Sequence, residues 1–269
     1  MIKRNIQYRD SVPLSMWKKM AIGTYQYVGD PSTYAMIDFD ATLIIKLIEE
    51  YQEKGVHLTP TTVFTKGIAM ALKEHPNANG MVRLGRFYRR KTVDIFLQTA
   101  PDKIGENLSA ITVKECDTKS LEEIAVEIAE KSDRVRKEGD PEYRAVKKIM
   151  AFIPFFFVKF FVNLNNFILH TLNIWSPLLN VPQDSFGSAM VTSIGMLGID
   201  NGFAPLVPYS RCPIILSVGQ ISKKAVVEND QIVIKPIITV CGNLDHRLID
   251  GVAAANVLKS FRKYMENPK

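Results

Sequence analysis

The spacing of apolar and polar positions changes along this chain. In the N-terminal part it predicts a strand followed by two helices. Residues 35–39 are strand-like, and Asp40 can cap the amphipathic stretch that continues to Glu53. A second helical stretch, residues 60–72, follows Thr59 and has proline at its first helical position, where the missing N–H costs nothing. The pattern therefore predicts a β-α-α start to the fold.

The middle of the chain repeats this alternation. Residues 92–98 and 109–113 have the pattern of strands. Ser120 stands three residues ahead of Glu123, which is the spacing of a capping box, and apolar residues then recur on one helical face up to Gly139. We therefore expect two strands followed by a long amphipathic helix.

The C-terminal part predicts a long hairpin and a final helix. Residues 214–227 and 232–240 are strand-like and flank Glu228-Asn229-Asp230, a turn-forming sequence. Strands that alternate with helices and finish in a hairpin indicate an α/β two-layer sandwich, in which helices cover a mixed β-sheet. No Pro/Ser/Gly-rich linker divides the chain, so we expect residues 1–269 to form a single domain.

Composition and charge narrow the function classes. The formal charge of +6 is modest for 269 residues, and the basic residues are spread without aromatic interleaving. This scattered distribution of basic residues indicates a solvated basic surface, which would attract anionic coenzymes, rather than a nucleic-acid-binding site. Met1 to Arg4 begin no signal-type segment, and the three cysteines, Cys116, Cys212 and Cys241, have no metal-ligand spacing. We expect a cytoplasmic protein without a metal site.

The candidate chemistry lies in Asp245-His246-Arg247-Leu248-Ile249-Asp250-Gly251, between the last predicted strand and the last predicted helix. A neutral imidazole can accept a proton from a thiol or hydroxyl near pH 7. Asp250 can bind a cation and fix the turn, and Gly251 can adopt backbone angles closed to other residues. His246 is thus a candidate base, with a buried or turn-stabilising histidine as the equal alternative on spacing alone. Cys241 is interpreted as a buried strand residue rather than a nucleophile.

This motif and its flanks resemble the catalytic domain of the dihydrolipoyl acyltransferases, the core subunits of the 2-oxoacid dehydrogenase complexes. That family typically reads Asp-His-Arg-x-x-Asp-Gly, and the chloramphenicol acetyltransferases share His-x-x-x-Asp-Gly with it. The other segments that resemble the family are Val12-Pro13-Leu14-Ser15, Thr59 to Thr62, Glu74 to Asn79, Val191-Thr192-Ser193-Ile194-Gly195 and Arg262 to Pro268. The resemblance covers nearly the whole chain, except a stretch from about Lys147 to Asn180.

The resemblance implies a fold, an assembly and a substrate. The fold would be that of chloramphenicol acetyltransferase, the assembly a homotrimer with active sites between neighbouring subunits, and the substrate acyl-coenzyme A. His246 of one subunit would deprotonate an acceptor thiol, and the Thr192 hydroxyl of the next would donate to the oxyanion, with Ser193 as the second choice. Ser193 and Gly195 would contact the coenzyme. Without the resemblance, Thr192 would be interpreted as an ordinary strand threonine.

Asp250 would support the turn in this family, as the partner of a basic residue from the first helix. The position of the chloramphenicol acetyltransferase arginine falls on Lys18, and lysine cannot make the bidentate fork that arginine makes with a carboxylate. Lys19 and Arg247 are the alternative partners, so the partner stays open.

Dihydrolipoyl acyltransferases carry lipoyl and subunit-binding domains ahead of the catalytic domain, whereas this sequence enters the catalytic domain by about Val12. It also ends without a hydrophobic tail. We therefore expect a free trimer with no covalent lipoyl group and no metal. Its acceptor would be a dihydrolipoyl group on a separate carrier protein, or a small hydroxyl or amine compound. A non-catalytic trimeric scaffold that binds a partner is the alternative function.

The stretch from Ile149 to Leu179 is rich in phenylalanine and is interrupted by Pro154, Lys159 and several asparagines. Its unbroken apolar run is half of the ~20 residues needed to cross a bilayer, so no transmembrane span is expected. Three interpretations remain, in order of preference: a helix pair packed on the core or the trimer interface, the lining of a long-chain acyl or hydrophobic acceptor pocket, and a membrane-surface segment assisted by nearby lysines.

Overall fold

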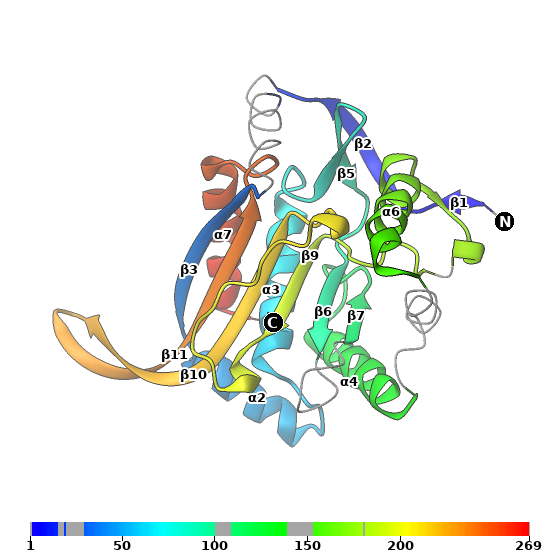
Figure 1. Cartoon of the computed structure of the whole chain (residues 1–269). Helices are drawn as coiled ribbons and strands as arrows, with labels where there is room; N and C mark the ends of the chain where they lie inside the picture. Colours follow the sequence, from blue (N-terminus) through cyan, green and yellow to red (C-terminus); the bar gives the residue numbers. More distant parts are fainter. Residues whose placement is uncertain are drawn as a thin grey trace.

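A mixed β-sheet forms the centre of the molecule (Figure 1). The computed structural model describes residues 2–15, 19, 30–99, 109–138, 153–179 and 181–268. In this part of the chain β9 is parallel to both of its neighbours, and the other pairs of the sheet are antiparallel. The strand order is β3 (Ser32–Asp40), β11 (Gln231–Asp245), β10 (Ile214–Glu228), β9 (Ala189–Ser193), β6 (Ile95–Thr99) and β7 (Ser109–Val113).

Helices cover one face of this sheet, which confirms the predicted two layers (Figure 1). α3 (Pro60–Glu74) lies against β9 and β10 at the middle of the face and packs on α7 (Gly251–Met265). α2 (Thr42–Glu53) and α4 (Leu121–Glu138) contact α3 beside it. The predicted mixed sheet covered by helices is therefore the fold of the described residues.

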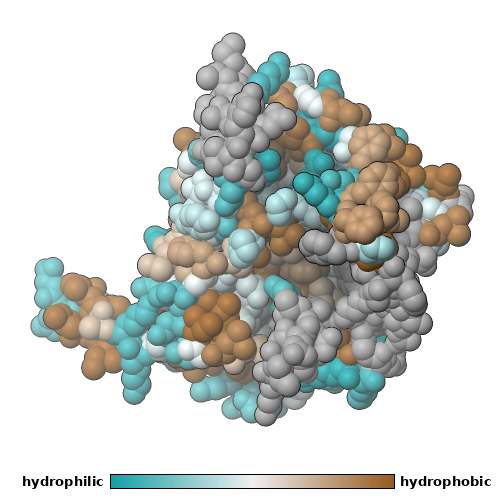
Figure 2. Space-filling model, viewed as in Figure 1, coloured by the Kyte–Doolittle hydropathy of each residue, from teal (hydrophilic) through white to brown (hydrophobic). Residues whose placement is uncertain are grey.

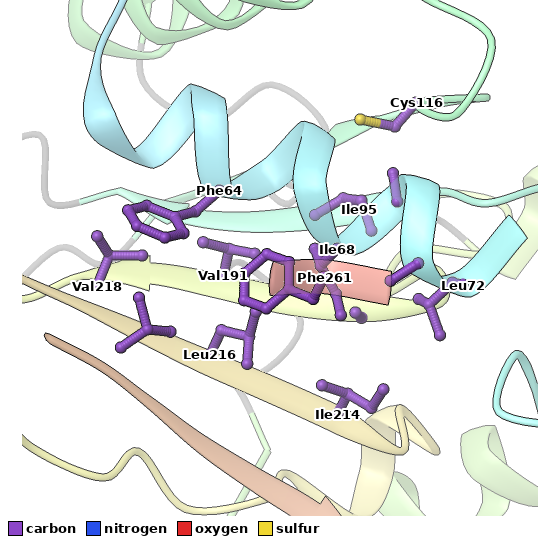
Figure 3. Packing of buried hydrophobic residues seen from close by; sticks show 14 of the residues in the cluster. Phe64, Ile68, Leu72, Ile95, Cys116, Val191, Ile214, Leu216, Val218 and Phe261 are labelled. Carbon is purple, nitrogen blue, oxygen red and sulfur yellow. The ribbon is translucent and has the colours of Figure 1, made fainter. Parts of the chain in front are cut away.

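The core lies between α3 and the sheet. Figure 3 shows Phe64 and Ile68 of α3 above Val191 of β9. Phe39, Phe64 and Phe261 meet edge to face, with ring centroids 5.3, 5.5 and 6.0 Å apart, an arrangement that aromatic pairs prefer. These contacts join β3, α3 and α7, so the helix that follows the His246 motif is held against the sheet.

The opposite face of the sheet carries a second, smaller apolar cluster. Successive strand residues point to opposite faces, so Ile95 and Val191 enter the main core while Phe96 and Met190 enter the second cluster. The connection from β9 to β10, with the short turns η3 (Gly195–Leu197) and η4 (Pro208–Ser210), packs on that cluster through Ala204 and Leu206. This face is therefore covered by a loop rather than by helices.

Two predicted helix starts are confirmed by their hydrogen bonds. Thr59 caps α3, because its Oγ1 accepts the N–H of Thr62 at 3.2 Å. Ser120 and Glu123 form the capping box of α4: the Ser120 N–H donates to Glu123 Oε2 at 2.7 Å, and the Glu123 N–H donates to Ser120 Oγ at 3.2 Å. The predicted end of that helix, Gly139, lies outside the described residues.

Two predicted boundaries are wrong by a few residues. Ala41, not Asp40, is the N-cap residue of α2, because β3 continues through Asp40; the Asp40 Oδ1 still accepts the N–H of Thr42 at 2.9 Å. The strand predicted at 92–98 begins only at β6, because Asp94 instead accepts, at 2.9 Å, a backbone N–H from the turn after β7. The first error comes from the extension of a strand into the expected cap, and the second from a carboxylate that binds a turn 21 residues away in the chain.

The predicted hairpin is confirmed. β10 and β11 are each 15 residues long and pair as far as Glu228 and Gln231. Asn229 and Asp230 have φ values of 51° and 61°, and two positive φ angles give the two-residue turn that matches strand twist. The hairpin tip projects from the body of the molecule (Figure 1).

A smaller layer lies beside the main sheet. α6 (Phe155–Asn166) continues into the π-helical η1 (Phe167–Thr171). The short strand β8 (Ile174–Trp175) and the turn η2 (Pro177–Leu179) follow it (Figure 1). In the described residues the aromatic stretch forms one helix with a π-helical end. Residues 149–152 of the stretch lie outside the described residues, so the helix pair stays a prediction. The strands of this layer are β2 (Tyr8–Pro13), β5 (Arg86–Arg90) and β4 (Gly80–Arg83) in one sheet and β1 (Lys3–Arg4) with β8 (Ile174–Trp175) in another.

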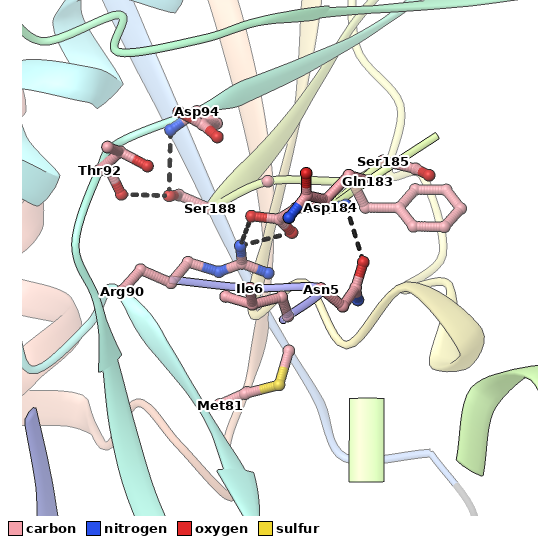
Figure 4. A network of polar contacts seen from close by, with 12 residues as sticks. Asn5, Ile6, Met81, Arg90, Thr92, Asp94, Gln183, Asp184, Ser185 and Ser188 are labelled. Atoms are coloured by element: carbon pink, nitrogen blue, oxygen red, sulfur yellow. Dashed lines mark hydrogen bonds and ion pairs between the residues drawn. The ribbon is translucent and has the colours of Figure 1, made fainter. Parts of the chain in front are cut away.

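A buried ion pair ties β5 of the smaller layer to the segment that leads into β9 of the main sheet. Arg90 Nη1 donates to both carboxylate oxygens of Asp184, at 2.7 Å for Oδ1 (Figure 4). The Asn5 Oδ1 accepts the backbone N–H of Asp184 at 3.0 Å. Burial lowers the pKa of Arg90, but the attraction of the Asp184 carboxylate outweighs burial and holds that pKa above its ordinary value. The smaller layer is therefore anchored to the body by a charge pair.

Candidate active site

His246 lies where β11 ends, in the turn that leads to α7. Its backbone N–H donates to the carbonyl of Pro31 at 2.9 Å, and its half-buried ring directs Nδ1 at the carbonyl of Ile249, 3.2 Å away. A carbonyl oxygen only accepts hydrogen bonds, so this contact requires the proton on Nδ1 and leaves the ring lone pair on Nε2. The turn therefore selects the tautomer in which Nε2 can act as a base.

Arg247 and Asp245, the two neighbours of His246 in the chain, form an ion pair with each other. Arg247 Nε donates to Asp245 Oδ1 at 2.9 Å and Nη2 to Oδ2 at 2.7 Å, while the Arg247 backbone N–H donates to Oδ1 at 3.0 Å. The side-chain hydrogen bonds to Asp245 raise the pKa of Arg247 against the effect of burial. Bidentate pairs of this kind fix orientation as well as charge. The backbone on both sides of His246 is thus held rigidly.

Asp250 caps the helix that follows. Its Oδ1 accepts the N–H of Ala253 at 2.8 Å, which satisfies one of the helix's first backbone donors. No ion pair joins Asp250 to a basic side chain within the described part of the chain. Of the three basic residues considered as its partner, Arg247 pairs with Asp245 instead, Lys19 is exposed, and Lys18 lies outside the described residues.

Gly251 does not use glycine-only backbone angles, so that prediction is wrong. It is the first residue of α7 and is absent from the residues with positive φ. A Cβ built on Gly251 would meet no atom within 4 Å. The capping carboxylate of Asp250, rather than the glycine, sets the start of the helix.

Thr192 and Ser193 lie at the end of β9, and both are half-buried. Thr192 is opposite Ser217 of β10 and Gln98 of β6, and Ser217 is in turn opposite Cys241 of β11. Val191 to Ser193 therefore lie on an inner strand of the sheet, whereas Gly195 lies in the turn η3 that follows it.

The register places Thr192 far from His246 within one chain. Thr192 is two strands from β11, at the level of Cys241, and Cys241 precedes His246 by five residues. Two strand spacings are about 10 Å and five strand residues about 16 Å, so the Cα atoms of Thr192 and His246 are about 19 Å apart in an ideal sheet. Groups that act on one reacting atom must lie within about 3 Å of it. One chain alone does not bring the candidate base and oxyanion donor together.

Gly195 occupies a position where backbones approach closely. A Cβ added there would lie 2.5 Å from the carbonyl oxygen of Gly219, and one added to Gly219 would lie 1.9 Å from that of Asp200. These glycines let the turn after β9 pack against β10, because any side chain would collide with backbone. A packing role accounts for Gly195; its contact with a coenzyme stays a prediction.

The remaining candidate groups are structural in the described residues. Cys241 is buried in the core as interpreted from the sequence, and burial raises the pKa of Cys116 and of Cys212 to about 12. His75 Nε2 bonds Ser260 Oγ at 2.9 Å, and His170 is buried. No group of three or more His, Cys, Asp or Glu side chains that could hold a metal ion occurs in the described ranges.

The inner side of α6 borders a cavity of about 170 Å³, lined among others by Val162, Leu169, His170, Phe186 and Tyr209. None of the residues that line it belongs to the His246 turn or to β9. The acyl-pocket interpretation of the aromatic stretch therefore finds a cavity, but not at the candidate catalytic residues.

A family model described as 2-oxoacid dehydrogenases acyltransferase (catalytic domain) matches residues 11–139 and 179–269. This chain belongs to the 2-oxoacid dehydrogenase acyltransferase family. The match includes Thr192 and the whole His246 turn, and it omits residues 140–178. That gap agrees with the stretch from about Lys147 to Asn180 that the sequence resemblance left unmatched.

Related acyltransferases support the same assignment. The dihydrolipoyllysine-residue acetyltransferase component of the pyruvate dehydrogenase complex from Rickettsia felis is 25% identical over 243 residues, which cover 88% of this chain and 48% of that protein. The chain therefore spans about half the length of the curated relatives that match along most of it.

Solved structures show the fold of this acyltransferase-family chain. The probable dihydrolipoamide acetyltransferase from Listeria monocytogenes has a TM-score of 0.65 at 22% identity, covering 95% of this chain and 93% of the other. Chloramphenicol acetyltransferase has a TM-score of 0.55 at 11% identity, covering 95% and 100%. The predicted chloramphenicol acetyltransferase-like fold is confirmed.

Proposed function

We propose that this chain is a coenzyme-A-dependent acyltransferase that moves an acyl group directly between the coenzyme A thioester and an acceptor thiol of the dihydrolipoyl type. The observation that carries the proposal is the orientation of His246: the contact of Nδ1 with the Ile249 carbonyl leaves the lone pair on Nε2. It occurs in the Asp-His-Arg-x-x-Asp-Gly turn of a chain that belongs to an acyltransferase family. A histidine held in this tautomer is suited to general-base catalysis.

In the proposed reaction, His246 Nε2 takes the proton of the acceptor thiol as its sulfur attacks the thioester carbonyl. The carbonyl oxygen becomes an oxyanion, to which Thr192 Oγ1, or Ser193 Oγ in second place, donates a hydrogen bond. The intermediate then collapses: its bond to the coenzyme A sulfur breaks, and the proton on His246 passes to that sulfur. One oxyanion donor of this kind is typically worth about 3 kcal/mol.

The proposed site requires a second copy of the chain. Thr192 is too far from His246 in its own chain, so the oxyanion donor would come from a neighbouring subunit, as in a homotrimer with sites between subunits. The projecting β10–β11 hairpin supports such an assembly, since its tip exposes the apolar side chains of Val227 and Ile232. Exposed apolar surface of this kind favours contact with another protein surface.

The acceptor and the setting are parts of the same proposal. A dihydrolipoyl group on a separate carrier protein is the first choice, because the Rickettsia felis relative is named as a dihydrolipoyllysine-residue acetyltransferase component. A small hydroxyl or amine compound is the alternative. The three cysteines are free and buried, which suits a reducing cytoplasmic setting.

The first experiment measures coenzyme A release from acetyl-, butyryl- and palmitoyl-coenzyme A, with and without dihydrolipoamide. Wild type is compared with His246→Ala and with His57→Ala, an exposed histidine outside the site. We expect acceptor-dependent release that is lost in His246→Ala and kept in His57→Ala. Equal release from all three proteins would contradict the role of His246. No release from a folded wild-type assembly would contradict the proposed activity and favour a non-catalytic scaffold.

A second experiment tests the shared site. His246→Ala and Thr192→Ala chains are unfolded, mixed and refolded together, so that some subunit interfaces combine an intact His246 with an intact Thr192. We expect activity well above that of either variant alone. Activity equal to the mean of the two variants would place both residues in one chain's site and contradict the assembly.

A further inference from the structure

The outer side of α6 carries a continuous apolar surface. At about 100° per residue, its side chains cover an arc of about 140° on the helix. Phe156 is 75% exposed and Phe160 is 60% exposed, although aromatic side chains of this size are usually buried. We define this aromatic face as the exposed side chains of Phe156, Phe157, Phe160, Phe161, Leu164 and Phe167.

The aromatic face points outward because the other side of α6 is anchored. Val162, Asn165 and Leu169 border the cavity beneath the helix. Asn166 Oδ1 accepts hydrogen bonds from Arg211 Nη2 at 2.9 Å and Nε at 3.2 Å. Buried contacts on the inner side therefore set the orientation of the helix, and its phenylalanines lie on the opposite, exposed side.

The apolar surface continues onto the neighbouring elements. β8 contacts η1, Ile174 of β8 and Leu178 of η2 are exposed, and Figure 2 shows hydrophobic residues gathered over α6 and beside β1. β1 is paired with β8 so that Lys3 lies opposite Trp175 and Arg4 opposite Ile174. Two exposed cations and a tryptophan thus lie at the border of the apolar surface.

The charge of this region has one sign. Among the described residues 153–179 there is no aspartate or glutamate, and Lys159 is the charged side chain. Lys159 is exposed on α6 and lies about 60° from the edge of the aromatic face. Aromatic and aliphatic side chains bordered by lysine and arginine are the composition that binds the interface of an anionic bilayer.

We propose that the aromatic face docks on the surface of an anionic phospholipid membrane. The phenylalanines would enter the interface between headgroups and acyl chains, and Lys3, Arg4 and Lys159 would approach the phosphates. Contact is at the surface, because no helix among the described residues is long and apolar enough to cross a bilayer. The segment lies in the part of the chain, residues 140–178, that the family model does not match, so the surface is additional to the catalytic fold.

A second copy of the chain fits this surface less well. Two aromatic faces in contact would bring Lys159, Lys3 and Arg4 of one copy toward the same cations of the other, without a carboxylate among the described residues 153–179 to neutralise them. An anionic lipid surface satisfies the apolar and the charged parts together.

The test is flotation of the full-length assembly with lipid vesicles. Vesicles of phosphatidylcholine alone are compared with vesicles of phosphatidylcholine and phosphatidylglycerol in equal amounts, at low and high salt. We expect wild type to float with the anionic vesicles and to bind less at high salt, because salt screens the lysine and arginine contacts. Absence of binding to the anionic vesicles would overturn the proposal.

Matched variants separate the aromatic contribution from a general loss of apolar surface. Phe156→Ser with Phe160→Ser should weaken vesicle binding at least about tenfold, since each ring removes a large apolar area. Leu43→Ser with Val126→Ser, at exposed apolar positions of α2 and α4, should bind like wild type. If both double variants weaken binding equally, the aromatic face has no specific role and the proposal fails.

Charge is tested in the same way. Lys159→Gln should weaken binding to anionic vesicles by about fivefold and leave weak binding to neutral vesicles unchanged. Lys46→Gln, an exposed lysine of α2, is its control and should match wild type. Light scattering without lipid gives the competing outcome: if Phe156→Ser with Phe160→Ser lowers the number of subunits while vesicle binding stays intact, the face binds another copy instead.

Discussion

α3 and α6 are both strongly apolar helices, yet the large apolar residues are buried on α3 and exposed on α6. On α3, Val63, Phe64 and Ile68 are buried, because the sheet, α4 and α7 surround the helix. On α6, Phe156 and Phe160 are exposed, because neighbours cover only the side that holds Val162 and Asn165. The number of packed neighbours, rather than the hydrophobicity of the helix itself, decides which apolar residues are buried.

The comparison separates a catalytic body from an attached surface. The body carries the His246 turn and Thr192 and matches the family model; α6 lies in the unmatched segment and carries no candidate catalytic residue. Substitutions in the two regions should therefore have different readouts. Activity and folding should depend on the body, and membrane binding should depend on the aromatic face of α6.

The largest expected difference between the regions is in catalysis. His246→Ala should lower kcat/KM for a short-chain acyl-coenzyme A by about a hundredfold to ten-thousandfold, because a general base is lost. Phe156→Ser with Phe160→Ser should keep kcat/KM within about threefold of wild type, since exposed substitutions usually leave the fold intact. Steady-state kinetics check both variants, and a similar loss in the two would remove the distinction between body and attached surface.

The buried pair of Arg90 and Asp184, which lies within the body that the family model matches, gives the next effect. Asp184→Ala leaves the Arg90 guanidinium buried without its carboxylate and should lower the free energy of unfolding by about 3–5 kcal/mol. Asp133→Ala removes an exposed i,i+3 ion pair with Arg136 and should change the free energy of unfolding by less than about 1 kcal/mol. Urea denaturation compares them, and Arg90→Met with Asp184→Leu should recover most of the loss. Equal effects of the two single variants would show that burial of the pair is unimportant.

His170 predicts a dependence of stability on pH. Burial, together with the charges of Arg90 and Arg211, lowers its pKa from the ordinary 6.5 to about 3. Between these values the unfolded chain binds a proton that the folded chain excludes, so stability falls as pH falls, by at most about 1.4 kcal/mol per pH unit. Urea denaturation from pH 7 to pH 4 should show this slope in wild type and a smaller slope in His170→Gln. An unchanged slope would assign the effect to other groups.

The smallest effect concerns the helix cap beside the base. Asp250→Ala removes the acceptor for the Ala253 N–H and should lower the free energy of unfolding by about 1 kcal/mol, whereas Asp250→Asn should lower it less. Thermal unfolding of the two variants gives the difference. If both lose activity without losing stability, Asp250 acts on the reaction rather than on the helix.

Much of the fold follows from short sequence signals. Thr59 with Pro60 and Ser120 with Glu123 start helices at the predicted residues, because a cap depends on atoms only two or three residues away. The hairpin turn is likewise local. Errors arose at Asp40 and Asp94, whose carboxylates bind backbone groups that the strand pattern alone does not reveal.

The candidate site was only partly predictable. The spacing of His246 and Asp250 and the family motif are visible in the sequence, whereas the cation partner of Asp250 stays open, because Lys18 lies outside the described residues. The buried pair of Arg90 and Asp184 was missed, because residues so far apart in the chain share no local pattern.

By itself, the sequence determined the family motif, the helix starts, the hairpin and the presence of an unmatched aromatic stretch, because each depends on residues close together in the chain. Only the tertiary structure decided that Thr192 lies two strands from His246, that Asp184 lies beside Arg90, and that the phenylalanines of α6 face outward. These facts depend on which distant segments cover one another, and burial is a property of that packing rather than of any one segment.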